Sequence, residues 1–247
     1  MNEVMLALGF FVVALLYASV GHGGATGYLA LLALVMPTLP HHEAATTALL
    51  LNTMVSGVAL VQFSRAGAWS FRQAAPFLIA SVPAAFLGGW MRITPQLFSM
   101  LLMVGLFAAA IRLMLPMGSQ PTAPTAMPRA AVCLGVGGIV GWVSGVVGIG
   151  GGVFLSPLLI LLRWASPRET AGIAACFVWF NSLAGLLARA ISGQLAIGVF
   201  IVPMLTALAG GLLGASLGAW RWRSLTLNRL LAIVLGVACF KIGLSMF

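Results

Sequence analysis

Apolar segments of about twenty residues follow one another along almost the whole chain. Six of them run without a helix-breaking cluster, and a helix of about 20 apolar residues is long enough to cross the hydrocarbon core of a bilayer. The sequence therefore predicts an all-α polytopic membrane protein. The six expected spans are Glu43–Phe63, Phe71–Met91, Pro95–Leu115, Arg168–Arg189, Leu195–Ala219 and Leu225–Phe247.

Composition supports the same class of protein. Of the 247 residues, 62% are hydrophobic and only 6% are charged, with a mean hydropathy of +1.13. A soluble domain is nearer a quarter charged, and the connections between the apolar segments are too short to hold one. The chain starts with an acidic residue, Glu3, rather than the basic stretch of a secretory signal, so we expect no cleavable signal peptide.

The net charge of +9 does not indicate a nucleic-acid partner. The twelve basic residues, eleven of them arginines, are scattered at the ends of the apolar segments and form no basic stripe. Membrane orientation explains that placement better. Cys133, Cys176 and Cys239 are isolated in apolar segments, so we expect small buried residues rather than a disulfide framework or a metal site, and no cofactor.

Two glycine clusters interrupt the remaining apolar segments, Met5–Met36 and Ala130–Leu162. The clusters begin at Gly21 and Gly148, and three glycines of the first cluster recur 127 positions later in the second. Glycine is a poor helix former, and helices broken at matching places in two halves of a chain mark the binding site of many transporters. We therefore expect a transporter built from two related halves.

The arginines favour a hairpin for each interrupted segment. If each segment enters the bilayer and returns to the same side, nine basic residues lie on one side, which should be cytoplasmic, and three on the other. Each half then crosses the membrane three further times, an odd number, so the halves must be inverted relative to each other. The three basic residues of the outer side are Arg92, Arg189 and Lys241.

This topology divides the chain into three parts. Residues 1–115 form the first repeat and residues 130–247 the second, each a glycine-broken helical hairpin plus three transmembrane helices. Residues 116–129 join them and contain four prolines, which exclude a helix. We expect this Pro-rich segment to be a cytoplasmic linker with little function of its own.

The stretch from Gly148 to Leu158, GIGGGVFLSPL, resembles the sulfite exporter TauE/SafE family of bacterial permeases. That family is recognised by a GxGGG stretch followed by an apolar run and a proline, once per half, and the resemblance covers nearly the whole chain. The first copy departs from the pattern at His22, Ala25 and Ala30. The resemblance implies a multi-pass protein of the bacterial inner membrane that carries sulfite, a sulfonate, or another organosulfur or organic acid.

Physical chemistry favours an anion independently of the resemblance. A helix that starts in mid-membrane presents unpaired N–H groups and the positive end of its dipole, and glycine lets an anion approach that backbone. Tight helix packing is the alternative role for these glycines. The candidate substrate-binding glycines are Gly23, Gly24, Gly150, Gly151 and Gly152.

Polar side chains near the breaks are further candidates for substrate binding. His22 can donate to an anion or couple transport to protons, or it can satisfy a freed carbonyl. Thr26 and Ser156 can donate hydroxyls to an oxyanion or cap the second half-helix. The next helix of each half adds Thr46, Thr47, Asn52 and Asn181, for which interhelical hydrogen bonding is the alternative.

Other charged residues are expected at the membrane surface. His41, His42 and Glu43 read as a solvated helix start rather than a zinc ligand set, and Glu169 as an interfacial charge. Arg112 and Lys241 occupy similar places near the end of the last helix of each half. They either contact the substrate or extend to the interface.

These observations predict a secondary transporter, most simply an exporter, that works by alternating access. The sequence contains no ATP-binding glycine-lysine loop, and a membrane enzyme would need an intramembrane cluster of histidines and carboxylates that it does not have. A divalent-cation permease and a passive anion channel are the alternatives. The expected partners are a small anion and the lipid bilayer. The choice of anion, proton or ion coupling, the direction of transport and a homodimeric state are left open by the sequence.

Overall fold

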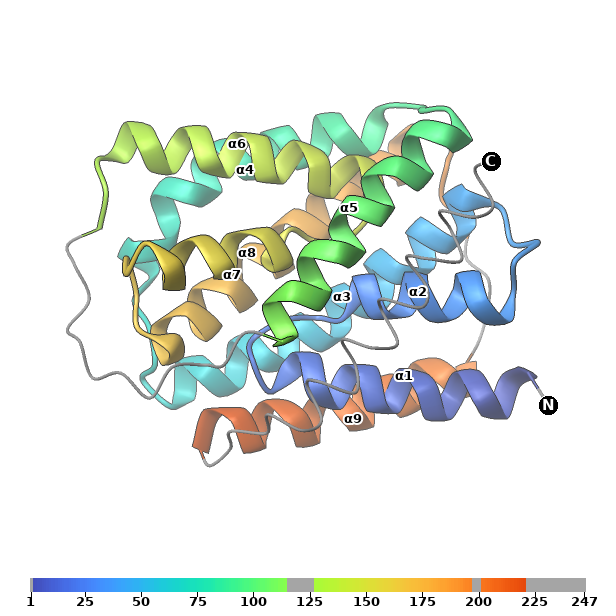
Figure 1. Cartoon of the computed structure of the whole chain (residues 1–247), viewed down its shortest axis with the longest axis horizontal. Coiled ribbons are helices and arrows are strands. Elements are labelled where there is room, and N and C mark those ends of the chain that lie inside the picture. Colours follow the sequence, from blue (N-terminus) through green and yellow to red (C-terminus); the bar gives the residue numbers. More distant parts are fainter. Residues whose placement is uncertain (1, 115–126, 197–200, 221–247) are drawn as a thin grey trace.

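The computed structural model describes residues 2–114, 127–196 and 201–220, and every regular element within them is a helix (Figure 1). The first five are α1 (Asn2–Ala18), α2 (Ala25–Val35), α3 (His41–Arg65), α4 (Phe71–Trp90) and α5 (Pro95–Met114). After the linker come α6 (Ala130–Val147), α7 (Gly152–Leu161), α8 (Pro167–Ile191) and α9 (Ile201–Trp220).

The chain is a multi-pass membrane protein. Five helices, α3, α4, α6, α8 and α9, are long and apolar enough to cross a bilayer. The predicted spans match α3, α4, α5, α8 and α9 to within a few residues at most ends. The sixth span, Leu225–Phe247, lies outside the described residues, as do residues 116–126 of the linker.

Each interrupted segment is a pair of helices that enters and leaves at the same end of the molecule. In Figure 1, α1 begins and α2 ends at the end where the N-terminus lies, whereas α6 begins and α7 ends at the opposite end. The two hairpins therefore point toward each other and their breaks lie in the interior. Inverted repeats require this arrangement. The equivalence of the two halves stays a prediction, because the last predicted helix of the second half lies outside the described residues.

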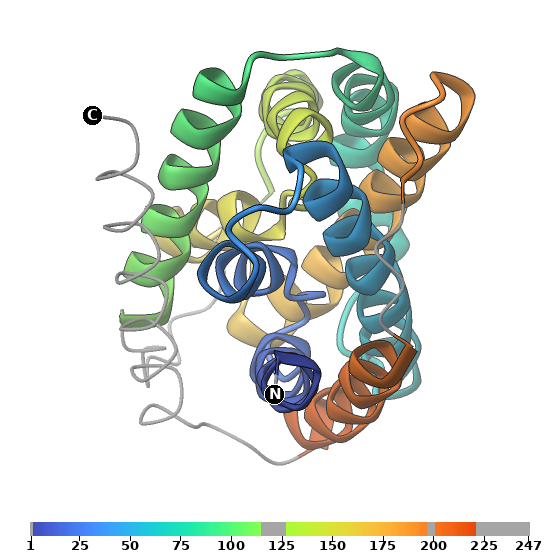
Figure 2. The same cartoon turned by 90° about the vertical axis from the view of Figure 1, so that its right-hand side faces the viewer.

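Glycines allow the first helix of each hairpin to pack closely on a helix of the other half. Figure 2 shows α1 beside α9 on one side of the molecule and α4 beside α6 on the other, and these are close-packed pairs. In each pair, a Cβ atom added to any of three glycines spaced four apart would collide with the backbone of the facing helix or of the residue just after it. Such small residues are how membrane helices approach closely. The glycines are Gly210, Gly214 and Gly218 on α9, and Gly137, Gly141 and Gly145 on α6.

The helices α3 and α8 cross the centre of the molecule and pack on each other between these two pairs. A capping box starts α8: the Ser166 N–H donates to the Glu169 carboxylate (2.8 Å), and the Glu169 N–H donates to the Ser166 hydroxyl. Gln73 of α4 also donates to Glu169. Glu169, which the sequence predicts to be an interfacial charge, thus caps the start of α8 and ties it to α4.

Candidate functional site

The first helix break lies between α1 and α2. The backbone leaves α1 after Ala18 and re-enters a helix at Ala25, with Gly24 as the N-cap residue of α2. Gly24 has φ 96°, a left-handed conformation that a residue with a Cβ adopts only at a cost. Glycine is therefore required here for the chain to reverse within a few buried residues.

The second break repeats this backbone conformation. Gly148 ends α6 with φ 84°, and Gly151 is the left-handed N-cap residue of α7 with φ 79°. Gly148 and Gly151 lie 127 residues after Gly21 and Gly24, and Gly21 also has a positive φ of 80°. The repeat of the glycines in the sequence is thus a repeat of backbone geometry at both ends of the break.

A histidine joins the two breaks. The Nε2 atom of His22 lies 3.0 Å from the Ser156 hydroxyl of α7, a hydrogen bond between the two halves of the chain that is fully buried. His22 is 4% exposed and its Nδ1 atom lies 3.1 Å from the Val20 carbonyl. Gly152 faces the same imidazole closely, since an added Cβ would lie 2.6 Å from its Cδ2 atom.

Asn52 of α3 lies between the breaks and contacts both. Its Oδ1 atom accepts a hydrogen bond from the Ala25 N–H (3.1 Å), one of the N–H groups that the start of α2 leaves without a helical partner. Its Nδ2 group donates to the Ser182 hydroxyl of α8 (2.8 Å). A Cβ at Gly23 or Gly150 would collide with the Asn52 side chain, so these glycines bring both breaks within reach of one amide.

Two buried polar groups beside the breaks, and one on α8, make no hydrogen bond to the described residues. Next to Gly24 is the Tyr28 hydroxyl, and next to Gly151 is the Ser144 side chain. On α8, both the oxygen and the nitrogen of the Asn181 amide are without a partner in the described part of the chain. An unpaired buried polar group costs free energy, so these groups are suited to receive a polar ligand.

The space between the breaks is closed in this structure. A narrow crevice is lined by both glycine clusters, His22, Thr26, Asn52 and Val178, and it leaves no room for a water-sized sphere. The Thr26 hydroxyl already shares a hydrogen bond with the Tyr17 hydroxyl (2.9 Å). A ligand can therefore enter only if the two breaks move apart.

The structure gathers most of the predicted site residues at the two breaks. Thr46 lies apart from them: its hydroxyl donates to the carbonyls of His42 and Gln194. Thr47 is buried, and its hydroxyl has no partner among the described residues. No three potential metal ligands lie together in the described ranges. Lys241 and the side chain of Arg112 lie outside what the structure describes.

Sequence reasoning did not find Ser182, Tyr17, Tyr28 or Ser144. Each is an ordinary residue within an apolar helix, and its role depends on the neighbour that the fold supplies. One signal was available for Ser182, because it follows Asn181 directly on the helix that was expected to supply polar groups.

Comparison with known proteins agrees with this architecture. The sequence model of the family described as "Sulfite exporter TauE/SafE" matches residues 5–246. A Sinorhizobium fredii protein called "Probable membrane transporter protein y4hK" is 34% identical over 246 residues, covering 98% of both chains. A Xylella fastidiosa "Probable membrane transporter protein" is 30% identical over 116 residues, which is 47% of this chain and 42% of that protein. No solved structure is significantly similar to the chain. The glycine-broken hairpins, the membrane helices and these matches together show that the chain is a membrane transporter of the sulfite exporter TauE/SafE family.

Proposed function

We propose that this transporter carries a small anion, such as sulfite, a sulfonate or another organosulfur or organic acid, and binds it between the two helix breaks. The observation that carries the proposal is the meeting of two buried helix N-termini, those of α2 and α7, through the His22–Ser156 hydrogen bond. Both helices begin at a left-handed glycine, so backbone N–H groups and the positive ends of two helix dipoles face one small region.

The buried polar side chains at this place fit an oxyanion. The hydroxyls of Tyr28 and Ser144 can donate hydrogen bonds, as can the amide of Asn181, which precedes Ser182 on α8, and among the described residues nothing accepts them. The crevice has no carboxylate in its lining, and a cation would need one. For this reason the anion is preferred over the divalent cation of the alternative hypothesis.

The closed crevice supports alternating access, because a ligand needs the breaks to move apart before it can bind. The anion reaches the breaks when the hairpins separate on one side, and it leaves when they separate on the other. In this proposal the moving units are the two inverted halves, residues 1–115 and 130–247. Opening must break the His22–Ser156 contact, because it bridges the halves.

Coupling to protons would need a titratable side chain at the breaks. The chain has three carboxylates, Glu3, Glu43 and Glu169, and none lines the crevice. His22 is the residue there whose charge can change near neutral pH. A His22→Gln variant that keeps binding but loses pH dependence of flux would support proton coupling through this imidazole. Unchanged pH dependence would exclude it.

The test is flux into proteoliposomes that contain the purified protein. Sulfite, thiosulfate, sulfoacetate, taurine and lactate are compared, with nickel as the cation control, in the presence and absence of a pH gradient. Saturable flux of a sulfur oxyanion that the other sulfur oxyanions compete for is the expected result. Anion flux that does not saturate would indicate a passive channel, and nickel flux without anion flux would overturn the proposal.

A further inference from the structure

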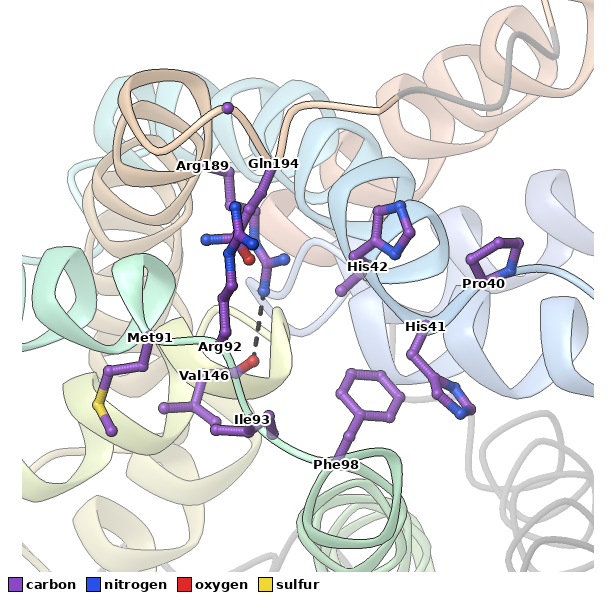
Figure 3. Close-up of a pocket in the computed structure, with 12 residues that line it drawn as sticks. Pro40, His41, His42, Met91, Arg92, Ile93, Phe98, Val146, Arg189 and Gln194 are labelled. Atoms are coloured by element: carbon purple, nitrogen blue, oxygen red, sulfur yellow. Dashed lines mark hydrogen bonds between the residues drawn. The ribbon is translucent and has the colours of Figure 1, made fainter.

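A cavity of about 510 Å³ lies at the end of the molecule where α3 begins and α4 and α8 end. Figure 3 shows that its walls come from the start of α3, the connection between α4 and α5, the end of α8 and the last turn of α6. We call it the Arg92–Arg189 pocket after two of its lining residues. Its volume is within the range of pockets that bind small organic molecules, about 300–1,000 Å³.

The ionisable side chains of this pocket are all basic. Arg92, Arg189, His41 and His42 line it, and none of its described lining residues is an aspartate or glutamate. In Figure 3 the side chains of Arg92 and Arg189 both reach into the pocket, from the α4–α5 connection and from α8. Two guanidinium groups in one cavity repel a cation and favour an oxyanion, which they can bind through paired hydrogen bonds.

Arg189 is held in a place that is costly for a charge. It is 4% exposed, and its Nη2 atom donates to the carbonyls of Gly145 and Val146, each at 3.3 Å. Those carbonyls end α6, so the contact also favours the cation at the negative end of a helix dipole. The Nε–H of Arg189 is buried and has no acceptor in the described part of the chain. The two hydrogen bonds that cap α6 use Nη2, so they do not explain why the Nε–H is buried.

The floor of the pocket adjoins the second helix break. Ala45 and Val146 line the pocket, and the backbone of Ala45 faces Gly148, where an added Cβ would lie 3.0 Å from the Ala45 carbonyl oxygen. Arg189 contacts the last turn of α6, which ends at the same break. An anion held by Arg189 thus lies beside the end of α6 that leads into the second break.

We propose that the Arg92–Arg189 pocket is a second binding site, which holds the oxyanion group of the substrate before it reaches the helix breaks or after it leaves them. The inference rests on the proposed function for the identity of the anion. The class of ligand is a sulfite, sulfonate or carboxylate anion small enough for a cavity of about 510 Å³. Arg92 supplies an exposed guanidinium at the mouth and Arg189 a buried one at the floor.

Calorimetric titration of sulfoacetate and sulfite tests the pocket, with protein purified in an uncharged detergent so that both faces are accessible. Arg92→Gln should raise the Kd at least tenfold. The control is Gln96→Glu, which lowers the charge of the same end of the molecule equally from an exposed position of α5 that does not line the pocket. Its Kd should stay within twofold of that of the unmodified protein.

Three results would overturn the inference. One is a Kd that changes by less than twofold in Arg92→Gln, and another is an equal increase in Gln96→Glu, which would indicate a surface potential rather than a site. The third is Arg92-dependent binding of phosphatidylglycerol with none of sulfoacetate or sulfite, because the pocket would then hold a lipid headgroup. An Arg189→Lys variant, checked for folding by gel filtration, should weaken binding as well, since lysine lacks the Nε donor.

Failure of the pocket and failure of the proposed function give different results. If the unmodified protein transports a sulfur oxyanion but its binding does not depend on Arg92, the pocket is wrong and the site at the breaks stands. If binding depends on Arg92 and no anion is transported, the pocket stands and the proposed function is wrong.

Discussion

The two helix breaks have the same backbone and different surroundings. Gly24 and Gly151 are both left-handed N-cap residues, 127 positions apart. At the first break, however, Asn52 accepts the Ala25 N–H, and the Thr26 hydroxyl is bonded to Tyr17. The position 127 residues after Asn52 is Trp179, whose ring faces Gly57 and Phe180 instead of a helix start.

Among the described residues, the start of α7 at the second break therefore makes fewer hydrogen bonds to side chains than the start of α2 at the first. No cap side chain bonds to the start of α7, and Ser144 beside Gly151 has no hydrogen-bond partner among the described residues. We infer that the helix start at the first break is held mainly by Asn52, whereas the helix start at the second break is left to the substrate, with the Tyr28 hydroxyl of the first break as a further donor. A doubled fold can thus keep its backbone geometry while the first copy takes more of the structural role and the second more of the binding.

The largest expected effect is that of Gly151→Ala. The substitution puts a Cβ on a left-handed residue (φ 79°), at 2.8 Å from the Phe177 ring, so the start of α7 must move. We expect flux in proteoliposomes to fall at least about 100-fold, because about 2.7 kcal/mol of lost transition-state stabilisation has that effect. Gly67→Ala is the matched control, since Gly67 is also left-handed (φ 59°) and nothing lies within 4 Å of its added Cβ. Equal loss of flux in both variants would show that strain alone is responsible.

Asn52→Ala should destabilise the fold more than it changes substrate selectivity. It removes two buried hydrogen bonds and leaves the Ala25 N–H without its acceptor, so we expect a loss of about 1–3 kcal/mol in the free energy of unfolding. Thermal unfolding in detergent measures the change. Thr53→Ala is the control on the next residue, because the Thr53 hydroxyl donates within its own helix, to the Leu49 carbonyl. If the two variants unfold at the same temperature, Asn52 does not hold the breaks together.

Asn181→Leu should change transport more than stability, which is the reverse of Asn52→Ala. The amide has no hydrogen-bond partner among the described residues, so an apolar side chain of similar size should leave the unfolding temperature unchanged or raise it. If the amide binds the anion, the KM for flux should rise about tenfold, which corresponds to 1.4 kcal/mol. A loss of stability like that of Asn52→Ala, with an unchanged KM, would instead indicate a structural amide.

The glycine pattern and the apolar lengths predicted the helices and the place of the breaks because both are local properties. Gly21, Gly24, Gly148 and Gly151 interrupt apolar runs, and all four have a positive φ. The contacts across the molecule were not predictable in this way. His22 and Ser156 are 134 residues apart, and Asn52 and Ser182 are 130 apart, so only the fold decides that they meet.

Arg189 shows a different limit of the sequence. A basic residue near the end of an apolar segment was expected at the membrane surface, and arginine side chains near helix ends commonly extend there. In the structure its helix continues to Ile191, and the guanidinium turns inward to the last carbonyls of α6. The local sequence is compatible with a side chain that extends to the surface or turns inward, and only the neighbouring end of α6 decides between the two.

Ser156→Ala should have the smallest effect and bears on how the two breaks separate. Interhelical hydrogen bonds in membrane proteins contribute about 0.6 kcal/mol on average, so the loss of the His22 contact should lower stability by about that much. Because the contact must break before the site opens, its loss should speed transport by up to about threefold. Ser216→Ala is the control, since it removes another interhelical hydrogen bond, to Gln62 (3.1 Å), away from the breaks. A slower Ser156→Ala transporter would mean that this hydroxyl contacts the anion and contributes more to binding than to closure.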